Sequence, residues 1–365
     1  MSTVIKSMKK VLCTVLIVAV MLVYWVPQEV SATESYTTGT LRIMSANLKT
    51  TTGINLIDGS NNRATNFAAF MGLYQPDSIG LQEVAKNTIP GSGGQSWNAW
   101  FNDNIGIGNL VNYASTGKKS DYGTDLYGDS KEYCLILYNK TKYTLVHSGG
   151  IWIGENPASD SLSDVFTSTD NSGTTIAMKH SRVLSWALLK NTSTGASYLH
   201  VNCHPDTRLA GGIGLMQTEV IVKKVQDLVS LYKVPVVLTG DFNYDERTDD
   251  RTDYNDYYKF LTNKISYDGV TSGLVDGKYA TKDCSEIGTS CGYASSYDET
   301  KSQVLDRVCF MNRKKMFSLT GMSYSCSVSK SRVVRAYTFD GVNYDTKDIS
   351  DHSPVYTNLT FNYTK

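Results

Sequence analysis

The sequence predicts a layered α/β fold, and three features of the chain support this prediction. Short runs rich in β-branched and aromatic residues recur along the chain, bounded by Gly, Asp or Asn, as is typical of strands. Segments with helical periodicity lie between some of these runs, which favours sheets covered by helices on their outer faces. The composition, with 41% hydrophobic and 19% charged residues, is that of a globular protein with a proper core.

Eight runs are predicted as strands because they are short, apolar and rich in β-branched or aromatic residues. In chain order they are Leu41–Ala46, Asp77–Leu81, Tyr133–Tyr138, Arg182–Leu189, Ser197–Asn202, Val234–Thr239, Val304–Met311 and Pro354–Thr360.

Three helices are predicted, over Asn61–Tyr74, Leu215–Tyr232 and Tyr254–Leu261. In the first two, apolar side chains recur on one face at helical spacing, a pattern of core packing rather than of a cofactor site. Three stretches rich in Gly, Ser, Thr, Asn and Asp are predicted as surface loops. They are Pro90–Gly108, Glu155–Gly173 and Asp245–Gly292. No repeat or linker divides the chain, so one domain with long loops is the simplest interpretation.

The first 32 residues have the pattern of a signal peptide. Three lysines precede an uncharged, largely apolar run over Val11–Val26, and a small-residue cleavage site ends at Ala32. The run is short for a bilayer span of about 20 residues, so an uncleaved anchor is the less favoured alternative. We therefore expect a secreted protein with one domain over residues 33–365 and no stable membrane insertion after cleavage.

The charge balance excludes some classes of protein. The chain has 35 Lys+Arg and 35 Asp+Glu; cleavage removes three Lys and one Glu, which leaves 32 basic and 34 acidic residues, a net charge of −2. A protein that holds nucleic acid tightly on a broad basic surface should show a large positive excess. An acidic disordered protein should show the reverse, with fewer apolar residues.

Six cysteines remain after cleavage, an even number in an oxidising compartment. Cys284 and Cys291 lie close together in a stretch rich in Gly, Ser and Asp, and they are the predicted disulfide pair. Cys134, Cys203 and Cys309 lie inside strand-like runs, where buried thiols are at least as expected as disulfides.

Polar residues stand where many of the predicted strands end or begin. Each of them alone is typical of a turn or a cap. Together they bring two histidines, four acids and several carboxamides to strand ends, which in a layered sheet meet at a common edge. The segments are Asn47, Gln82-Glu83, Asn202-Cys203-His204, Asp241-Phe242-Asn243, Asp306-Arg307 and Asp351-His352.

These residue types indicate metal-dependent chemistry. Asn47, Glu83 and Asp351 offer hard oxygen ligands, which suit Mg²⁺ or Mn²⁺ better than zinc. Asp241 could orient or deprotonate a water molecule, and Asn243 could hold that water or a phosphate. A metal, a histidine and an aspartate together are suited to in-line attack of water on a phosphoester.

The two histidines have separate candidate roles. His204 and His352 can act as general acid or base, or can stabilise a phosphate. A catalytic histidine usually needs a carboxylate that fixes its tautomer, and Asp306 is the candidate partner of His352.

The motifs resemble those of the endonuclease/exonuclease/phosphatase superfamily. Its members include pancreatic-type deoxyribonucleases, abasic-site endonucleases, neutral sphingomyelinases, inositol polyphosphate 5-phosphatases and deadenylases. Six segments match in the family's order and span nearly the whole chain after residue 32. They are Met44–Asn47, Leu81–Glu83, Asn202–Asp206, Thr239–Asn243, Leu305–Val308 and Ser350–Val355.

The resemblance implies a four-layer α/β sandwich with two central mixed sheets. It implies that Glu83 is the principal metal ligand, with Asn47 and Asp351 nearby. It also implies that Asp241 and Asn243 lie at the scissile phosphate.

The resemblance assigns further roles to groups around the phosphate. His204 would stabilise or protonate it, and His352, paired with Asp306, would complete the acid–base machinery. Glu132 resembles the family acid that supports the first histidine. Arg182 resembles an arginine of a strand found in some secreted and deadenylase-like members, in which Trp186 is also matched.

One segment departs from the family pattern. The usual Thr-His-Leu-Asp stretch is replaced here by Cys203-His204-Pro205-Asp206. Alternation along the strand points Cys203 away from His204, so that change should be tolerated. Pro205 removes a backbone donor and stiffens the loop.

We therefore expect a secreted phosphoester hydrolase that depends on Mg²⁺ or Mn²⁺, and first a phosphodiesterase or nuclease, with nucleic acid as a candidate substrate. Basic clusters at Arg313–Lys315 and at Arg332 with Arg335 could meet phosphates, although solvated surface is the favoured interpretation. The alternative is a phosphomonoesterase or lipid phosphodiesterase of the inositol-phosphate phosphatase or sphingomyelinase type. A non-catalytic binding protein on the same fold is a third alternative, against which the intact set of polar residues argues.

Overall fold

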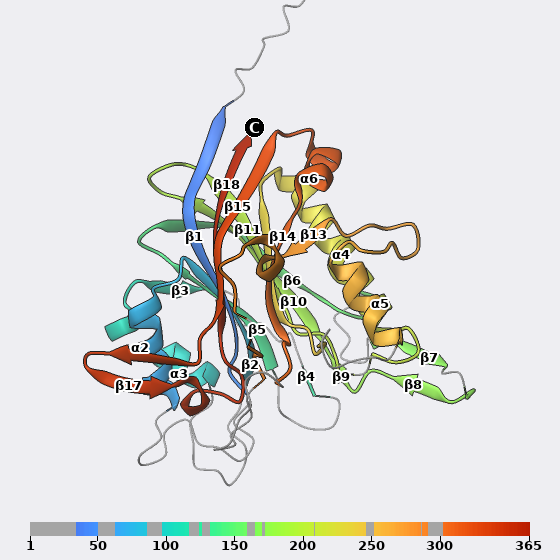
Figure 1. Cartoon of the computed structure of the whole chain (residues 1–365), viewed down its shortest axis with the longest axis horizontal. Coiled ribbons are helices and arrows are strands. Elements are labelled where there is room, and N and C mark those ends of the chain that lie inside the picture. Colours follow the sequence, from blue (N-terminus) through green and yellow to red (C-terminus); the bar gives the residue numbers. More distant parts are fainter. Residues whose placement is uncertain are drawn as a thin grey trace, which may run out of the picture. The chain divides into compact units, whose positions relative to one another are not determined.

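Two six-stranded mixed sheets pack face to face in this computed structural model, with helices on their outer sides (Figure 1). The structure describes residues 34–49, 63–85, 97–116, 124–125, 132–158, 165–169, 172–207, 209–245, 252–285, 287–290 and 302–365. Residues Ser35–Lys365 form one compact unit, and the predicted signal peptide lies outside the described residues. Within the described part, no helix is long and apolar enough to cross a membrane.

The first sheet joins the two ends of Ser35–Lys365. β1 is antiparallel to β18 and parallel to β2, so β1 and β2 end at the same edge of the sheet. In order across the sheet, the strands are β15 (Tyr324–Val333), β18 (Val355–Thr364), β1 (Ser35–Asn47), β2 (Ser78–Ala85), β5 (Glu132–Asn139) and β3 (Tyr113–Ser115).

The second sheet also contains one parallel pair, β11 and β12, among antiparallel neighbours. These two strands therefore also end at a common edge. In order across the sheet, the strands are β13 (Leu274–Asp276), β14 (Asp306–Met311), β12 (Val236–Asp241), β11 (Ser197–Cys203), β10 (Val183–Asn191) and β6 (Tyr143–Trp152).

Three small two-stranded sheets and several helices complete the described structure. The small sheets are β4 (Thr124–Asp125) with β9 (His180–Ser181), β7 (Thr167–Thr169) with β8 (Thr175–Ala177), and β16 (Ala336–Phe339) with β17 (Val342–Asp345). The α-helices are α2 (Arg63–Tyr74), α3 (Trp97–Asn104), α4 (Ile213–Tyr232), α5 (Thr252–Leu261) and α6 (Arg313–Thr320). The short 3-10 helices are η1 (Gly108–Leu110), η2 (Gly277–Ala280) and η3 (Thr346–Asp348).

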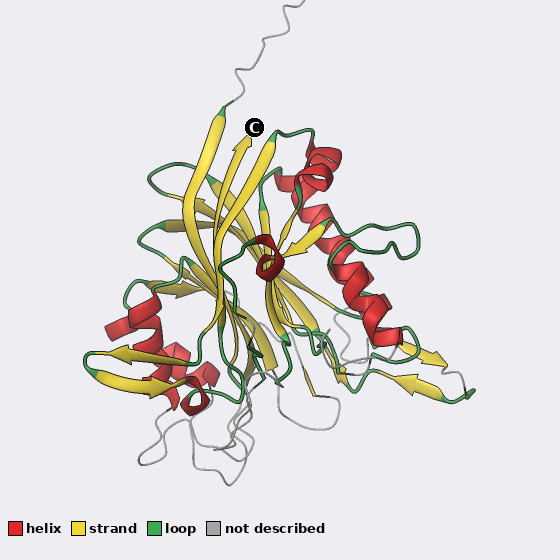
Figure 2. Cartoon of the chain, in the orientation of Figure 1, coloured by secondary structure: helices red, strands yellow, loops and turns green. Residues whose placement is uncertain are grey.

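The helices form the two outer layers, which Figure 2 shows on either side of the strands. On one side, Phe67 and Phe70 of α2 belong to a buried cluster with Ile79 of the first sheet. On the other, Ile221 and Val225 of α4 are part of the core that contains the strands of the second sheet. The expectation of a layered α/β fold with two central mixed sheets is confirmed.

A line of buried polar contacts crosses between the two sheets near the edge where β1 and β12 end. His200 on β11 is hydrogen-bonded to Ser78 on β2 (2.7 Å) and to Thr239 on β12 (2.9 Å). Gln82 on β2 donates from Nε2 to Asn202 Oδ1 (2.6 Å). At Gly80 a Cβ atom would lie 2.1 Å from Thr239 Oγ1, so only glycine allows this close approach of the sheets.

The eight predicted strands correspond to β1, β2, β5, β10, β11, β12, β14 and β18, and the three predicted helices to α2, α4 and α5. The prediction of a loop over Pro90–Gly108 was wrong at α3. There Trp97 and Phe101 pack their rings against Phe67, so tertiary contacts rather than local pattern make this helix.

Further elements escaped the sequence pattern: the predicted loops Glu155–Gly173 and Asp245–Gly292 contain the strands β7 and β13, and β6, β15 and α6 were also missed. The strand β15 alternates mainly small polar residues with a few apolar ones. Helix α6 buries only Met316 and is fixed by its ends, where Asn312 Oδ1 accepts a hydrogen bond from Lys315 N and Gly321 adopts a left-handed conformation.

Three cysteines lie buried in strands of the two sheets. Cys134, Cys203 and Cys309 are buried in β5, β11 and β14, as the interpretation of buried strand thiols requires. The predicted pairing of Cys284 stays a prediction, because Cys291 lies outside the described residues.

Candidate functional site

The predicted site residues converge where parallel strands of both sheets end. Asn47 ends β1, Asp241 ends β12, and Glu83 lies in β2. Asn47 donates from Nδ2 to Glu83 Oε1 (2.9 Å) and to Asp241 Oδ2 (2.8 Å). One buried amide therefore connects a carboxylate of the first sheet with one of the second.

Glu83 reaches this position because β2 is irregular at its end. The pairing of β2 with β5 shifts register between Leu81 and Val84, and Glu83 has a positive φ of 54°. Such a bulge turns a side chain away from the regular alternation of the strand. Glu83 is half-buried, whereas Asp241 is almost fully buried.

Asp241 lies at the centre of the site and is almost fully buried. Its Oδ1 accepts a hydrogen bond from Asn243 N (2.9 Å), and Asn243 donates from Nδ2 to Pro205 O (2.9 Å). Loss of solvation by burial raises the pKa of Asp241 to about 6, although the charge of His352 and the hydrogen bonds from Asn243 N and the Asn47 amide act in the opposite direction.

His352 is paired with a carboxylate, as the sequence predicts. Its Nδ1 lies 2.8 Å from Asp306 Oδ2 and 3.8 Å from Asp241 Oδ2. Burial by itself would lower the pKa of His352, but the negative charges of Asp306 and Asp241 and the hydrogen bond to Asp306 raise it well above its ordinary value. His352 is therefore a cation at neutral pH.

His204 has a different neighbour. Arg182 donates from Nη1 to His204 Nδ1 (3.3 Å), and His204 Nε2 lies 3.6 Å from Asp241 Oδ2. Burial lowers the pKa of His204 well below its ordinary value, and the charge of Arg182 adds to this effect. His204 is therefore neutral.

Glu132 was predicted to support His204. It begins β5, but its side chain lies outside the described part of the structure, so this role stays a prediction. The contact between Arg182 and His204 was not foreseen. The match of Arg182 to a family strand was noted in the sequence, but no sequence signal says which way its side chain points.

Asp351 lies beside these residues, but its carboxylate is paired with Lys49. Its Oδ2 is 3.2 Å from Lys49 Nζ, and neither of the clusters of ligating side chains found among the described residues includes it. The adjacent Ser350 donates from Oγ to Asn47 O (2.7 Å), which places the Asp351 segment against the end of β1.

Two residues that support the site were missed by sequence reasoning. Arg63 donates from Nε to Ile349 O (2.6 Å) and from Nη2 to Lys49 O (3.1 Å), and it also contacts Leu48 O. Trp97 donates from Nε1 to Leu48 O (3.0 Å). Together they hold the chain just after Asn47 and just before Ser350. A buried arginine at a helix start has the same sequence appearance as a solvated one.

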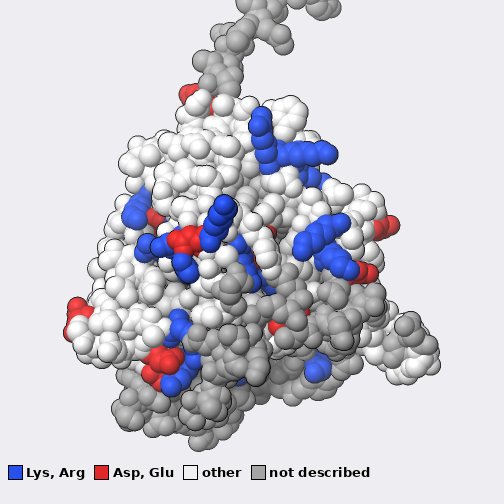
Figure 3. Space-filling view, in the orientation of Figure 1, with Lys and Arg blue, Asp and Glu red and all other residues white. Residues whose placement is uncertain are grey.

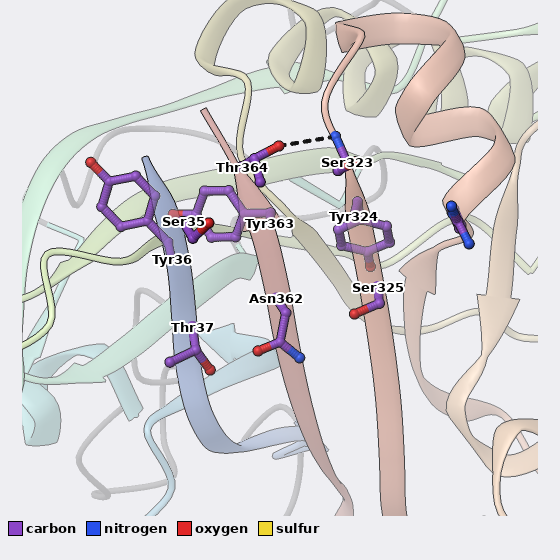
Figure 4. A pocket seen from close by; sticks show the side chains of 10 residues that line it. Ser35, Tyr36, Thr37, Ser323, Tyr324, Ser325, Asn362, Tyr363 and Thr364 are labelled. Atoms are coloured by element: carbon purple, nitrogen blue, oxygen red, sulfur yellow. Dashed lines mark hydrogen bonds between the residues drawn. The ribbon is translucent and has the colours of Figure 1, made fainter. Parts of the chain in front are cut away.

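A separate pocket of about 480 Å³ lies at the opposite end of β1 (Figure 4). Ser35 and Thr37 of β1, Asn362 of β18 and Arg313 of α6 are among its lining residues. None of the predicted site residues lines it, so the polar edge and this pocket are distinct.

Comparisons with known proteins identify the fold. No protein family model matches the chain, and no curated protein does. Among solved structures, a mannosyl-6-phosphatase from Bacteroides thetaiotaomicron VPI-5482 matches with a TM-score of 0.58 and 20% identity, over 87% of this chain and 99% of that one. An endonuclease/exonuclease/phosphatase from Bacteroides vulgatus matches with a TM-score of 0.58 and 20% identity, over 88% and 98%. The chain has the endonuclease/exonuclease/phosphatase fold.

A further match with the same fold is the human Nocturnin catalytic domain, with a TM-score of 0.51 and 15% identity, over 90% of this chain and 97% of that one. At these identities the matches establish the fold over the described structure. The chemistry of the site rests on this chain's own residues.

The donors of one cluster in this endonuclease/exonuclease/phosphatase fold suit a divalent cation. Single ligand atoms of Glu83, His204 and Asp241 all lie within 4.8 Å of one another, and so do those of Asp241, Asp306 and His352. In the second set, Asp306 and His352 are hydrogen-bonded to each other, which makes them less suited to bind an ion. The first set has two carboxylates, one of them half-exposed, and suits Mg²⁺ or Mn²⁺.

The hydrogen bonds of Asn47 agree with a need for positive charge at this place. Its amide N–H group lies between the carboxylates of Glu83 and Asp241, while its Oδ1 accepts from Lys49 N (2.9 Å). In this orientation the amide oxygen is turned away from Glu83. Metal ligation by Asn47, like that by Asp351, stays a prediction.

Proposed function

We propose that the protein is a divalent-metal-dependent phosphoester hydrolase. One observation carries this proposal: a buried carboxylate, Asp241, is flanked by a cationic His352 and a neutral His204, beside the carboxylate of Glu83. Hydrolysis of an anionic ester requires a base, hydrogen-bond donors with and without positive charge, and hard oxygen ligands for a metal, all at one place.

Asp241 is suited to act as the base. Its pKa of about 6 is high enough to accept a proton from an attacking water and low enough to be ionised at neutral pH. The hydrogen bond from Asn243 N holds one oxygen, Oδ1, in place. The other oxygen, Oδ2, faces both histidines.

The remaining groups are suited to the phosphoryl oxygens. His352 supplies a positive charge at the place where negative charge increases in the transition state, and Asp306 keeps it protonated. His204 and the side-chain amide of Asn243 can donate hydrogen bonds to the same oxygens. Donors that are already fixed in position cost no reorganisation during the reaction.

A divalent cation would be held at the carboxylate of Glu83, which already accepts a hydrogen bond from the Asn47 amide. When bound, such an ion neutralises phosphoryl oxygens as a Lewis acid. Because Glu83 belongs to the first sheet and Asp241 to the second, one sheet would supply the ion ligand and the other the base.

For the substrate, a phosphodiester remains the first proposal and a phosphomonoester the second. Arg313 lines the pocket at the far end of β1, and Arg332 pairs with Asp283, whereas Arg335 donates to Ser353 Oγ (3.1 Å), next to His352. The face in Figure 3 shows Lys and Arg beside Asp and Glu at several places, and a group of basic side chains without acidic neighbours over α6. One of the matched structures is a mannosyl-6-phosphatase, which handles a phosphomonoester.

The test is a substrate panel on the purified protein. It contains plasmid DNA, RNA, bis-p-nitrophenyl phosphate, p-nitrophenyl phosphate, mannose 6-phosphate, sphingomyelin and inositol phosphates, each with Mg²⁺, Mn²⁺, Ca²⁺ or chelator. We expect turnover of at least one ester that chelator abolishes. Asp241→Asn should be inactive, while Asp227→Asn on the exposed face of α4 should match the wild type. Absence of metal-dependent turnover on every substrate would reject the proposal.

A further inference from the structure

We propose that Arg182 is a positioning residue that fixes the tautomer of His204, so that His204 can only donate a hydrogen bond to the reacting phosphoester. This inference rests on the proposed function for the identity of the acceptor. The arrangement of Arg182 and His204 stands on its own geometry.

The direction of the hydrogen bond decides the tautomer. Arg182 Nη1 lies 3.3 Å from His204 Nδ1, and a guanidinium group has only donors. Nδ1 must therefore accept, and a neutral imidazole then carries its proton on Nε2. Nε2 lies 3.6 Å from Asp241 Oδ2, so this N–H group faces the centre of the site.

Arg182 is itself held from several elements. Its Nε lies 3.8 Å from Oδ2 of Asp206, which is fully buried. Asp206 Oδ2 also accepts a hydrogen bond from His180 N (2.9 Å), and Asp206 N donates to Gln217 Oε1 on α4 (2.7 Å). Moving Arg182 away would leave the buried carboxylate of Asp206 without this cation, which is costly in a site away from water.

This arrangement has a chemical consequence. A carboxylate at Nδ1 would make the imidazole a stronger base, as Asp306 does for His352. A guanidinium group at Nδ1 does the reverse, because a proton added to that nitrogen would meet a positive donor. His204 can therefore donate a hydrogen bond from its Nε2–H group. Its Nδ1 cannot take up a second proton.

The direct test is ¹⁵N NMR of the histidine side chains in the ligand-free protein, with His204→Gln used for assignment. We expect His204 Nδ1 to show the shift of an unprotonated nitrogen and Nε2 that of a protonated one. Arg182→Met should give a mixture of tautomers, whereas Arg182→Lys, which also has only donors, should restore the wild-type pattern. A wild-type ring that is protonated on Nδ1, or an unchanged pattern in Arg182→Met, would overturn the inference.

Kinetics supply a second test, on the ester selected by the panel. Arg182→Met should lower kcat by about tenfold or more, with a smaller change in KM, since it disturbs a donor to the transition state. A rise in KM with unchanged kcat would mean that Arg182 binds substrate instead and would contradict the positioning role.

Amide substitutions at His204 keep the test decisive if Arg182→Met does not fold. The side-chain amide of glutamine can place a donor near the position of Nε2, whereas that of asparagine reaches only the position of Nδ1. His204→Gln should therefore retain about tenfold more activity than His204→Asn. Equal, near-complete loss in both would indicate that His204 transfers a proton, against the inference. Because NMR needs no turnover, an inactive wild type would reject the proposed function and leave the tautomer result to decide this inference.

Discussion

The two histidines on either side of Asp241 carry the same imidazole group, but one is neutral and the other is positively charged. Both rings are buried, and burial alone lowers the pKa of each. His204 has a guanidinium group at its Nδ1 and stays neutral, whereas His352 has a carboxylate at its Nδ1 and is charged. The partner at one nitrogen thus determines what the other nitrogen can do.

This comparison shows why one site needs two histidines. A phosphoryl group that gains negative charge is stabilised by a fixed positive charge and by neutral donors, which do different work. The group shared by both halves is Asp241, so changes there should be the most severe.

The largest effect is therefore expected for Asp241→Asn. It removes the base and the carboxylate that faces both histidines, and kcat should fall by about 10³-fold or more. Steady-state kinetics on the selected ester measure this, with circular dichroism to verify the fold. A loss below about tenfold would mean that the reaction is centred elsewhere.

The next largest effect concerns the charged half of the site. Asp306→Asn removes the carboxylate that keeps His352 protonated, and we expect kcat to fall by about 100-fold. His352→Gln should have a similar effect, and the double variant should be no worse than His352→Gln alone, because the pair acts as a unit. Additive losses would show that Asp306 acts independently of His352.

A smaller effect is expected on the pH profile. Asp241 is active as the carboxylate, so with its pKa of about 6 the rate should decrease as pH falls through 6. The positive charge of His352 holds this pKa down, so in His352→Gln the same decrease should begin at a higher pH. The profile of kcat/KM between pH 4.5 and 8 measures both, and a limb that does not move would mean that another group titrates.

The smallest effect concerns a third buried histidine, whose role is structural. Burial lowers the pKa of His200 to about 3, from an ordinary value of 6.5. Below pH 6.5 the unfolded chain therefore binds a proton at His200 that the folded chain does not bind. This group lowers the free energy of unfolding by about 1.4 kcal/mol for each pH unit below 6.5.

Urea unfolding at several pH values between 7 and 4.5 measures this loss. His200→Gln should lose less stability on acidification than the wild type. His147→Gln changes an exposed histidine and is the matched control. Identical acid sensitivity in all three proteins would contradict the assignment.

Strand ends were the part of this site that sequence could predict. Asn47, Glu83 and Asp241 each follow a strand with a clear apolar pattern, and parallel strands deliver their final residues to one edge. The pairing of His352 with Asp306 followed from a general need of histidine, and the structure shows it.

Contacts between residues far apart in the chain were not predictable in this way. Arg182 next to His204, and Arg63 beneath the ends of two segments, depend on how side chains cross between elements. No pattern of period 2 or 3.6 encodes such a crossing. Helix α3 and strand β15 were missed for a related reason, since packing rather than local preference forms them.

The amide of Asn47 has a consequence for inactivation. It reaches Glu83 within its own sheet and Asp241 across the gap between sheets, so both bonds survive only while the sandwich keeps its register. The line of buried polar contacts through His200 and Thr239, together with the close approach of the sheets at Gly80, fixes that register in the interior between the two sheets. A small shift of one sheet against the other, with both sheets intact, is thus enough to separate Glu83 from Asp241. Loss of activity should therefore detect such a shift before any measure of secondary structure does.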